Sequence, residues 1–108
     1  TEVAALNKVG RTETVLERTR GLLGRPALQR DEALWISPCN SVHTFGMKYP
    51  IDVIYLDCNQ IIRKVCNQVV PMRLSYCFSG RSTLELVSAN AARLGLRPGF
   101  GVEWLANV

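Results

Sequence analysis

The sequence lacks a long hydrophobic run, and this absence argues against a membrane-spanning helix within these 108 residues. No stretch reaches the roughly 18 to 20 consecutive apolar residues that a helix needs to cross a bilayer. The numbered chain starts at Thr1 without a basic-then-apolar leader, so no signal peptide is visible. A leader removed upstream would leave the same start. We therefore expect the cytoplasm slightly ahead of the periplasm or the exterior.

Acidic residues are fewer than basic ones, and histidine occurs once. The chain has 9 Asp and Glu against 13 Lys and Arg, which gives a net charge of +4. The basic residues are scattered from Lys8 to Arg97, whereas a nucleic-acid protein more often concentrates them in a stripe or a recognisable module. The counts alone therefore predict a mildly basic, solvated surface and argue against a nucleic-acid partner.

Paired cysteine motifs are absent as well, although the chain has four cysteines. None of the spacings is C-x-x-C, so neither a zinc knuckle nor a thioredoxin-type motif is present. An even number of cysteines permits disulfides, and four allow three pairings. We expect buried free thiols or one disulfide, with no metal and no cofactor. The cysteines are Cys39, Cys58, Cys66 and Cys77.

Two segments have the features of short helices. Thr14 and Glu17 form a capping box at the start of an apolar pattern with helical spacing, and Gly24 can take the left-handed conformation that ends a helix. A second, shorter helix is predicted to begin with Ser88 as its cap and to end at Gly95.

Strand signals recur along the chain. The predicted strands cover residues 3–9, 33–36, 51–56, 61–70, 82–87 and 102–105. Both alternate sets of side chains in residues 51–56 are mainly apolar, which predicts a strand with two buried faces. The polar segment 57–60 predicts a turn into the partner strand. Two short helices among about six strands predict one α+β domain over residues 1–108, with a mainly antiparallel sheet.

Three segments occur in an order that is typical of a known family. RGLLGRPAL, SVHTFGMKYPIDVIYLD and LELVSANAARLGLRPG, within about Val9 to Trp104, resemble domain-of-unknown-function family 192, a group of small bacterial and archaeal proteins. The resemblance implies a strongly curved, barrel-like antiparallel sheet with helices packed on it, and it implies no established activity. Family members often have a glycine in the hairpin turn where this chain has Gln60.

The segment PCNSVHTFGMKYPID, residues 38–52, concentrates side chains of the kind that form binding sites. Phe45 and Met47 offer apolar walls, and His43 offers a directional polar group, a combination common in ligand sites. Asp52 lies between strand apolars, so it either faces solvent or is buried with a partner such as Arg20. We predict a domain that binds a small ligand or a polymer end. The predicted binding residues are Arg20, His43, Thr44, Phe45, Met47, Asp52, Asp57 and Glu85.

Two alternatives remain open, together with the ligand and the oligomeric state. In a hydrolase or transferase, His43 would act with Cys39 as nucleophile and Asp52 as orienting carboxylate, or with Asp52, Asp57 or Glu85 in acid–base catalysis. Four residues of extended chain span roughly 13 Å, so Cys39 reaches His43 only if the chain folds back between them. The second alternative is a nucleic-acid or protein interaction module that uses the scattered arginines.

Overall fold

The structure is a computed structural model that describes the backbone of residues 8–11, 29–30 and 32–102, and the side chains of residues 29–30 and 32–102. The elements within these ranges are β1 (Lys8–Arg11), β2 (Glu32–Ile36), β3 (Ser41–His43), β4 (Ile51–Leu56), β5 (Ile62–Val69), β6 (Leu74–Tyr76), β7 (Ser82–Val87) and α2 (Asn90–Arg93). The strands at residues 33–36, 51–56, 61–70 and 82–87 are confirmed within a residue or two. Residues 8 and 9 of the first predicted strand belong to β1, and its other residues lie outside the described ranges.

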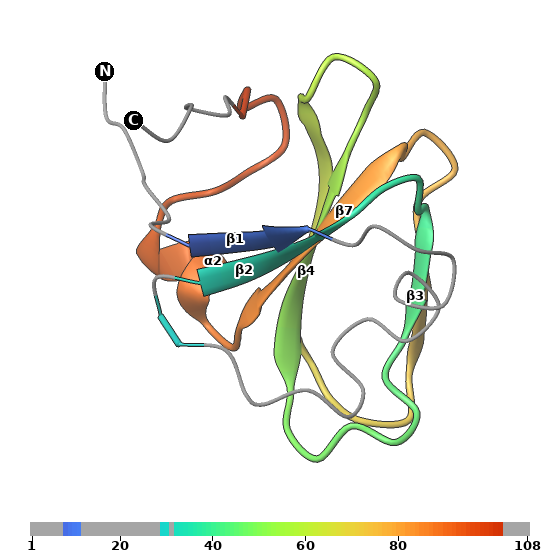
Figure 1. Cartoon of the computed structure of the whole chain (residues 1–108), viewed down its shortest axis with the longest axis vertical. Coiled ribbons are helices and arrows are strands. Elements are labelled where there is room, and N and C mark those ends of the chain that lie inside the picture. The colour runs from blue at the N-terminus through green and yellow to red at the C-terminus, as the bar shows by residue number, and fades with distance from the viewer. Residues whose placement is uncertain (1–7, 12–28, 31, 103–108) are drawn as a thin grey trace.

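The strands form two sheets that do not close into a barrel, so the barrel-like expectation is wrong. The larger sheet has the order β1-β2-β7-β4-β5, and β3 pairs only with β6. All pairs are antiparallel except the parallel pair β1–β2. A closed barrel needs every strand to pair on both edges, and the three-residue strands β3 and β6 are too short to continue the ladder on either side. Figure 1 shows β3 well apart from the five-stranded sheet and on the side opposite α2.

The backbone of Arg81, just before β7, links the end of β4 to the residues that lead into β3. The Arg81 N–H donates to the Leu56 carbonyl at the end of β4, and the Arg81 carbonyl accepts from the Cys39 N–H, which precedes β3, at 2.9 Å. The β3–β6 pair, called the ribbon below, forms a second layer on the larger sheet, because Val42 of β3 lies in one core cluster with Ile51, Val53 and Tyr55 of β4.

The central strand β4 is buried on both faces, as the two apolar sets predict. All six of its residues are buried. Ile51, Val53 and Tyr55 pack beneath the ribbon with Val42, and Ile54 and Leu56 pack on the other face with residues that include Ala91 of α2. Full burial of side chains of this size contributes about 1.5–3 kcal/mol each, so β4 holds both layers together.

The turn between β4 and β5 forms as predicted, and Asp57 organises it. Its Oδ1 accepts the N–H groups of Asn59 and Ile61 at 2.8 and 3.0 Å, and its Oδ2 accepts a hydrogen bond from Arg63 Nε at 2.7 Å. Gln60 has φ 62° and so takes the left-handed conformation for which glycine is better suited. The hydrogen bond from Ile61 is the main cause of a pKa of Asp57 below its ordinary 3.8. The Asn59 and Arg63 contacts lower that pKa further, against the opposite effect of burial.

We expect Asp57→Asn to remove a stabilisation that depends on pH. Because the pKa of Asp57 is lower in the folded chain, the ionised carboxylate stabilises the fold at pH values above its unfolded pKa. That contribution is lost as the pH falls through the folded pKa. Urea unfolding of both proteins from pH 7 to below pH 3 should show the variant less stable at neutral pH and a gap that narrows in acid. A gap that stays constant over this range would contradict the assignment.

The shorter of the two predicted helices is present in the described part of the chain, but its cap differs from the prediction. One helix, α2, lies in the described part of the chain, and the helix predicted over residues 14–24 lies outside it. The Ser88 cap is wrong, because the residue before α2 is Ala89 at φ 70° and no side chain of its own caps the helix. Gly95, at φ 71°, follows the helix as expected.

Of the strand predicted over residues 102–105, only Val102 is described, and it does not belong to a strand. Gly101 forms an isolated bridge with Ile61, Val102 lies next to it, and residues 103–105 are outside the described ranges. Among the described residues, no helix has the length and apolar character to cross a membrane.

Candidate functional site

Asp52 is fully buried, and backbone N–H groups occupy both of its carboxylate oxygens. Gln68 donates to Oδ1 at 2.8 Å, Ala89 donates to Oδ1 at 3.1 Å, and Ala91 donates to Oδ2 at 2.7 Å. The Gln68 N–H belongs to a bulge, because Ile51 pairs with Val69 but Val53 pairs with Cys66. Asp52 therefore joins β4 to β5 and to the start of α2. Of the two alternatives for Asp52, exposure to solvent or burial with a partner, the structure has the second. The suggested partner, Arg20, lies outside the described residues.

His43 lies on the outer face of the ribbon, away from Asp52. In β3 the side chains alternate, with Val42 buried and His43 exposed. The His43 ring lies 5.3 Å from the Phe45 ring, centroid to centroid. The Cys39 thiol donates instead to the Ser41 carbonyl at 3.0 Å. The described contacts thus do not bring the three predicted catalytic residues together.

The other predicted binding residues are inside the fold or in turns. Thr44 is buried, and its hydroxyl donates to the Val70 carbonyl at 2.7 Å and accepts the Arg73 N–H at 2.9 Å, which fixes the approach to β6. Met47 packs on the core beneath the ribbon. Glu85 is buried between β2 and β4. Burial raises the pKa of Tyr49, and the charge of Glu85 raises it further. Of the predicted binding residues that the structure describes, only His43 and Phe45 are exposed on the ribbon.

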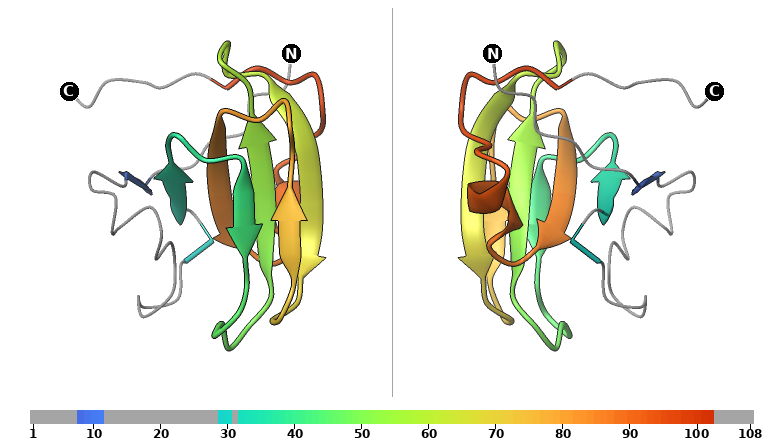
Figure 2. Two further views of the ribbon diagram at one scale, coloured as in Figure 1. Left: turned by 90° about the vertical axis from the view of Figure 1, so that its right-hand side faces the viewer. Right: turned by 90° about the vertical axis from the view of Figure 1, so that its left-hand side faces the viewer.

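The outer face of the ribbon is apolar and exposed. Met72, Leu74 and Phe78 are 65%, 68% and 88% exposed, and Phe45 and Tyr76 are about half exposed. These five are most of the large hydrophobic residues exposed in the described part of the chain. In Figure 2, left, β3 and β6 lie in front of the larger sheet with no described element over them. The ribbon face is defined as His43, Phe45, Met72, Leu74, Tyr76 and Phe78.

The part of the ribbon face that residues 72–78 form was not predicted, although the sequence carries a signal for it. Residues 72–78, MRLSYCF, alternate large apolar residues with other residues, which is the period of a strand with one apolar face. Such alternation is normally interpreted as an inward apolar face. Here Ser75 and Cys77 point toward the core, and the aromatic residues point outward: the Tyr76 and Phe78 rings lie 5.0 Å apart.

The charges of residues 37–102 are separated by burial. All three carboxylates in this range, Asp52, Asp57 and Glu85, are buried. Every lysine and arginine in the range is exposed, namely Lys48, Arg63, Lys64, Arg73, Arg81, Arg93 and Arg97. This part of the chain therefore presents positive charge and no exposed carboxylate. Counting charges in the sequence could not find this separation.

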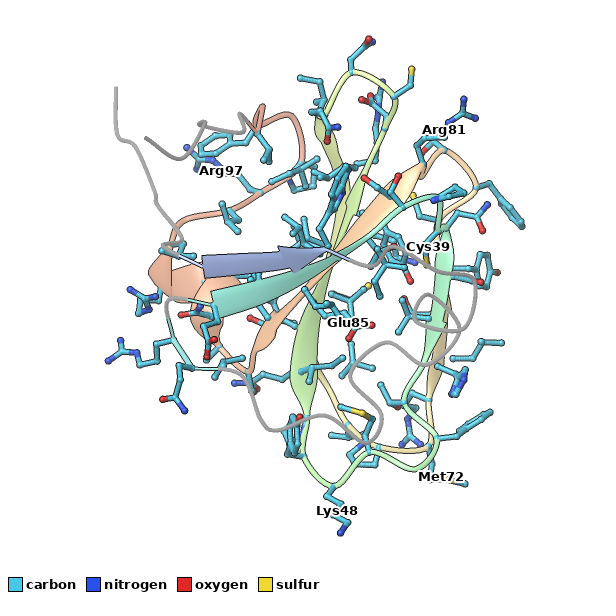
Figure 3. The ribbon with its side chains drawn as sticks, in the orientation of Figure 1. Cys39, Lys48, Met72, Arg81, Glu85 and Arg97 are labelled. Atoms are coloured by element: carbon cyan, nitrogen blue, oxygen red, sulfur yellow. The ribbon has the colours of Figure 1, made fainter. Side chains whose placement is uncertain are left out.

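Several of these cations surround the ribbon face. The Lys64 ammonium lies 5.5 Å from the centre of the Tyr76 ring and donates to the Tyr76 carbonyl at 2.8 Å. Arg73 is the residue just before β6, between Met72 and Leu74. Figure 3 places Arg81 near one end of the ribbon, and Lys48 toward the other end, near which Met72 also lies.

These features define a small, mostly antiparallel β domain with one short helix in its described part and an exposed aromatic, basic face. The chain belongs to domain-of-unknown-function family 192, described as "Uncharacterized ACR", whose family model matches residues 3–104. The comparison with curated proteins found no match.

Two solved structures have the same fold. One is a protein of unknown function from Novosphingobium aromaticivorans, with a TM-score of 0.78 and 24% identity, over 92% of this chain and 75% of that one. The other, from Sinorhizobium meliloti, is described as a "putative transcription regulator" and has a TM-score of 0.76 and 20% identity, over 84% of this chain and 76% of that one. At these identities the likeness shows the fold alone.

Proposed function

We propose that this protein binds single-stranded nucleic acid on the ribbon face. The observation that carries the proposal is the combination, on one face, of exposed aromatic side chains with surrounding cations and no exposed carboxylate from residues 37–102. Proteins that bind single strands without strict sequence preference combine aromatic side chains, on which bases stack, with a positively charged surface along the backbone.

The geometry assigns these two roles to different residues. Tyr76 and Phe78, together with Phe45 and His43, offer ring surfaces to unstacked bases. Lys64, next to Tyr76, is close enough to meet a phosphate of a base stacked on that ring. The alternation of β6 spaces its outward side chains by two residues, or about 6.6 Å along the strand, so a strand of nucleic acid can follow the ribbon.

A single strand fits this face better than a duplex. Aromatic rings stack only on bases that are exposed, and bases inside a duplex are not. Duplex DNA is commonly read by a helix that enters the major groove, but the only described helix, α2, has four residues and contacts β4, β5 and β7.

The small-ligand pocket predicted from the sequence has less support than the ribbon face as a binding site. Its central carboxylate, Asp52, already accepts three backbone hydrogen bonds. His43 and Phe45, which were predicted as binding residues, keep that role on the ribbon face. The hydrolase or transferase alternative lacks a described contact between Cys39 and His43.

Salt dependence tests the proposal. Four phosphate contacts, from Lys48, Lys64, Arg73 and Arg81, would give a slope of log affinity against log salt of about −3 for a single strand, which weakens binding about 50-fold between 50 and 200 mM salt. Fluorescence anisotropy with a labelled 12-nucleotide oligothymidine measures this slope. A duplex of the same length and a polyglutamate competitor serve as controls, and we expect both to bind more weakly.

Absence of binding to the single strand at low salt would overturn the proposal. Binding to vesicles of phosphatidylglycerol, without binding to the oligonucleotide, would replace the nucleic acid with an anionic membrane surface as partner.

A further inference from the structure

Three of the four cysteines gather on the inner side of the ribbon. Cys39, Cys66 and Cys77 come from the approach to β3, from β5 and from the end of β6, and all three are half-buried. All three pack against the same core cluster, which includes Tyr55. Cys58 is different, because it is exposed in the turn between β4 and β5.

The three thiols lie around the side chain of Tyr55. Tyr55 donates to the Ser75 hydroxyl at 3.0 Å, and that hydroxyl lies 3.4 Å from the Cys66 sulfur. Burial raises the pKa of Tyr55 to about 12, and the neighbouring thiols of Cys66, Cys39 and Cys77 add to this effect while the Ser75 hydrogen bond opposes it. The three sulfur atoms therefore lie within electrostatic reach of the same side chain.

The backbones of Cys39 and Cys77 are close together where the chain enters β3 and leaves β6. The Cys77 N–H donates to the carbonyl of Asn40 at 2.9 Å, and Cys39 is the residue before Asn40. Opposed residues in a hydrogen-bonded antiparallel pair have Cα atoms about 5.5 Å apart. Cys39 is offset from the residue opposite Cys77 by one position, or about 3.3 Å along the chain, so the Cα atoms of the two cysteines are roughly 6.4 Å apart, near the upper end of the 4.4–6.8 Å that a disulfide usually spans. The Cys39 backbone is also held by its N–H bond to Arg81 and by the Thr83 hydroxyl, which donates to its carbonyl at 3.0 Å.

Neither of these two thiols is held by a strong partner. Cys39 donates to a carbonyl two residues away, and Cys77 lies 3.4 Å from the exposed Ser79 hydroxyl. Cys66 instead shares Ser75 with Tyr55 beneath the ribbon. Within the described residues, no group of His, Cys, Asp and Glu is arranged to hold a metal ion. Because the three thiols pack against one core cluster, thiol–thiol chemistry is open to them.

We propose that Cys39 and Cys77 form an oxidisable dithiol that a peroxide converts into an intramolecular disulfide. The first thiol releases its proton and the thiolate attacks hydrogen peroxide: an S–O bond forms, the O–O bond breaks, and the hydroxide that leaves takes up the released proton, so the products are a sulfenic acid and water. The second thiol then attacks that sulfur: an S–S bond forms, the S–O bond breaks, and its proton leaves with the hydroxide as a second water. This bond would join the residue before β3 to the end of β6. The proposal does not depend on nucleic-acid binding.

Thiol counting and peptide mapping on the whole folded chain test the proposal. After treatment with hydrogen peroxide, we expect two of the four thiols no longer to react with an aromatic disulfide reagent. Reduction with dithiothreitol should restore their reaction. Mass mapping without reduction should join the peptide of Cys39 to that of Cys77. The melting temperature should rise on oxidation, because the bond constrains the unfolded chain.

Matched serine variants separate this pair from the other cysteines. Cys58→Ser should lose two thiols as the natural chain does, whereas Cys39→Ser and Cys77→Ser should each form no intramolecular disulfide. Mapping of the unsubstituted chain decides the matter even where a variant fails to fold. A disulfide that includes Cys66, a bond between two chains through Cys58, or four thiols that survive the peroxide would each overturn the proposal.

Discussion

We expect Asp52→Asn to lower the free energy of unfolding by about 2–4 kcal/mol, because it leaves buried donors without an acceptor. Asp52 accepts three backbone N–H groups, two at Oδ1 and one at Oδ2. An amide has one oxygen, so in either orientation its NH₂ group faces at least one N–H donor. The Ala91 N–H loses its acceptor if the amide oxygen keeps the position of Oδ1. Urea unfolding at pH 7, followed by circular dichroism, measures the change.

A matched variant removes a carboxylate without removing an acceptor. Glu32 accepts the Gln29 N–H at 2.8 Å through one oxygen, and a glutamine there keeps an oxygen for that bond. We expect Glu32→Gln to change the free energy of unfolding by less than about 0.5 kcal/mol. A similarly small change for Asp52→Asn would show that its carboxylate is not a structural group. It would also return Asp52 to the list of ligand-binding candidates.

The role of Asp52 shows where local sequence reasoning ends. The position between Ile51 and Val53 correctly indicated a carboxylate that needs a partner if it is buried. The sequence suggested a side chain, Arg20, but the described partners are backbone groups 16, 37 and 39 residues away. A backbone N–H has no sequence signature, and a bulge that exposes one depends on the pairing register. The same contact explains why α2 needs no cap from Ser88.

The fold was predictable where the strands are long and apolar. β4, β5 and β7 have six to eight residues each, so their patterns extend over enough positions to be recognised. β3 and β6 have three residues each and lie among prolines and glycine, and so neither was predicted. Because the ribbon consists of these two strands, only His43 and Phe45 of the candidate site were predicted, and its residues from Met72 to Phe78 were missed.

The burial of the carboxylates and the exposure of the cations could not be predicted from the sequence either. The predicted mildly basic surface followed from 13 basic and 9 acidic residues, with the implicit assumption that both kinds are equally exposed. Burial of Asp52, Asp57 and Glu85 removes three negative charges from the surface of residues 37–102. Each of these carboxylates was predicted as a ligand-binding residue. Asp52 and Asp57 instead hold backbone segments in place, and Glu85 lies in the interior.

The double substitution Tyr76→Ala and Phe78→Ala should weaken binding of the single-stranded oligonucleotide by about 30-fold or more, if each ring stacks on one base at about 1–3 kcal/mol. Both side chains are exposed, and Phe78 is 88% exposed, so the loss in unfolding free energy should stay within about 1 kcal/mol. Anisotropy titrations at one salt concentration measure the change in affinity, and urea unfolding verifies that the variant is folded.

Phe100 is the matched control for an exposed aromatic ring outside the ribbon face. It is 36% exposed, and the Arg97 guanidinium lies 4.8 Å from its ring centre. Phe100→Ala should leave affinity nearly unchanged. An equal loss in both variants would mean that exposed aromatic rings contribute without regard to position, which contradicts a site on the ribbon.

Stacking and phosphate contacts can be distinguished by their response to salt. Removal of Tyr76 and Phe78 lowers affinity at every salt concentration and leaves the slope of log affinity against log salt unchanged, because no charge is lost. Arg73→Gln removes one cation near the ribbon face, so the magnitude of that slope should fall by about 0.7. If the aromatic substitutions instead changed the slope and Arg73→Gln did not, the rings would act by positioning the cations. The ribbon face would then be an electrostatic surface and not a stacking platform.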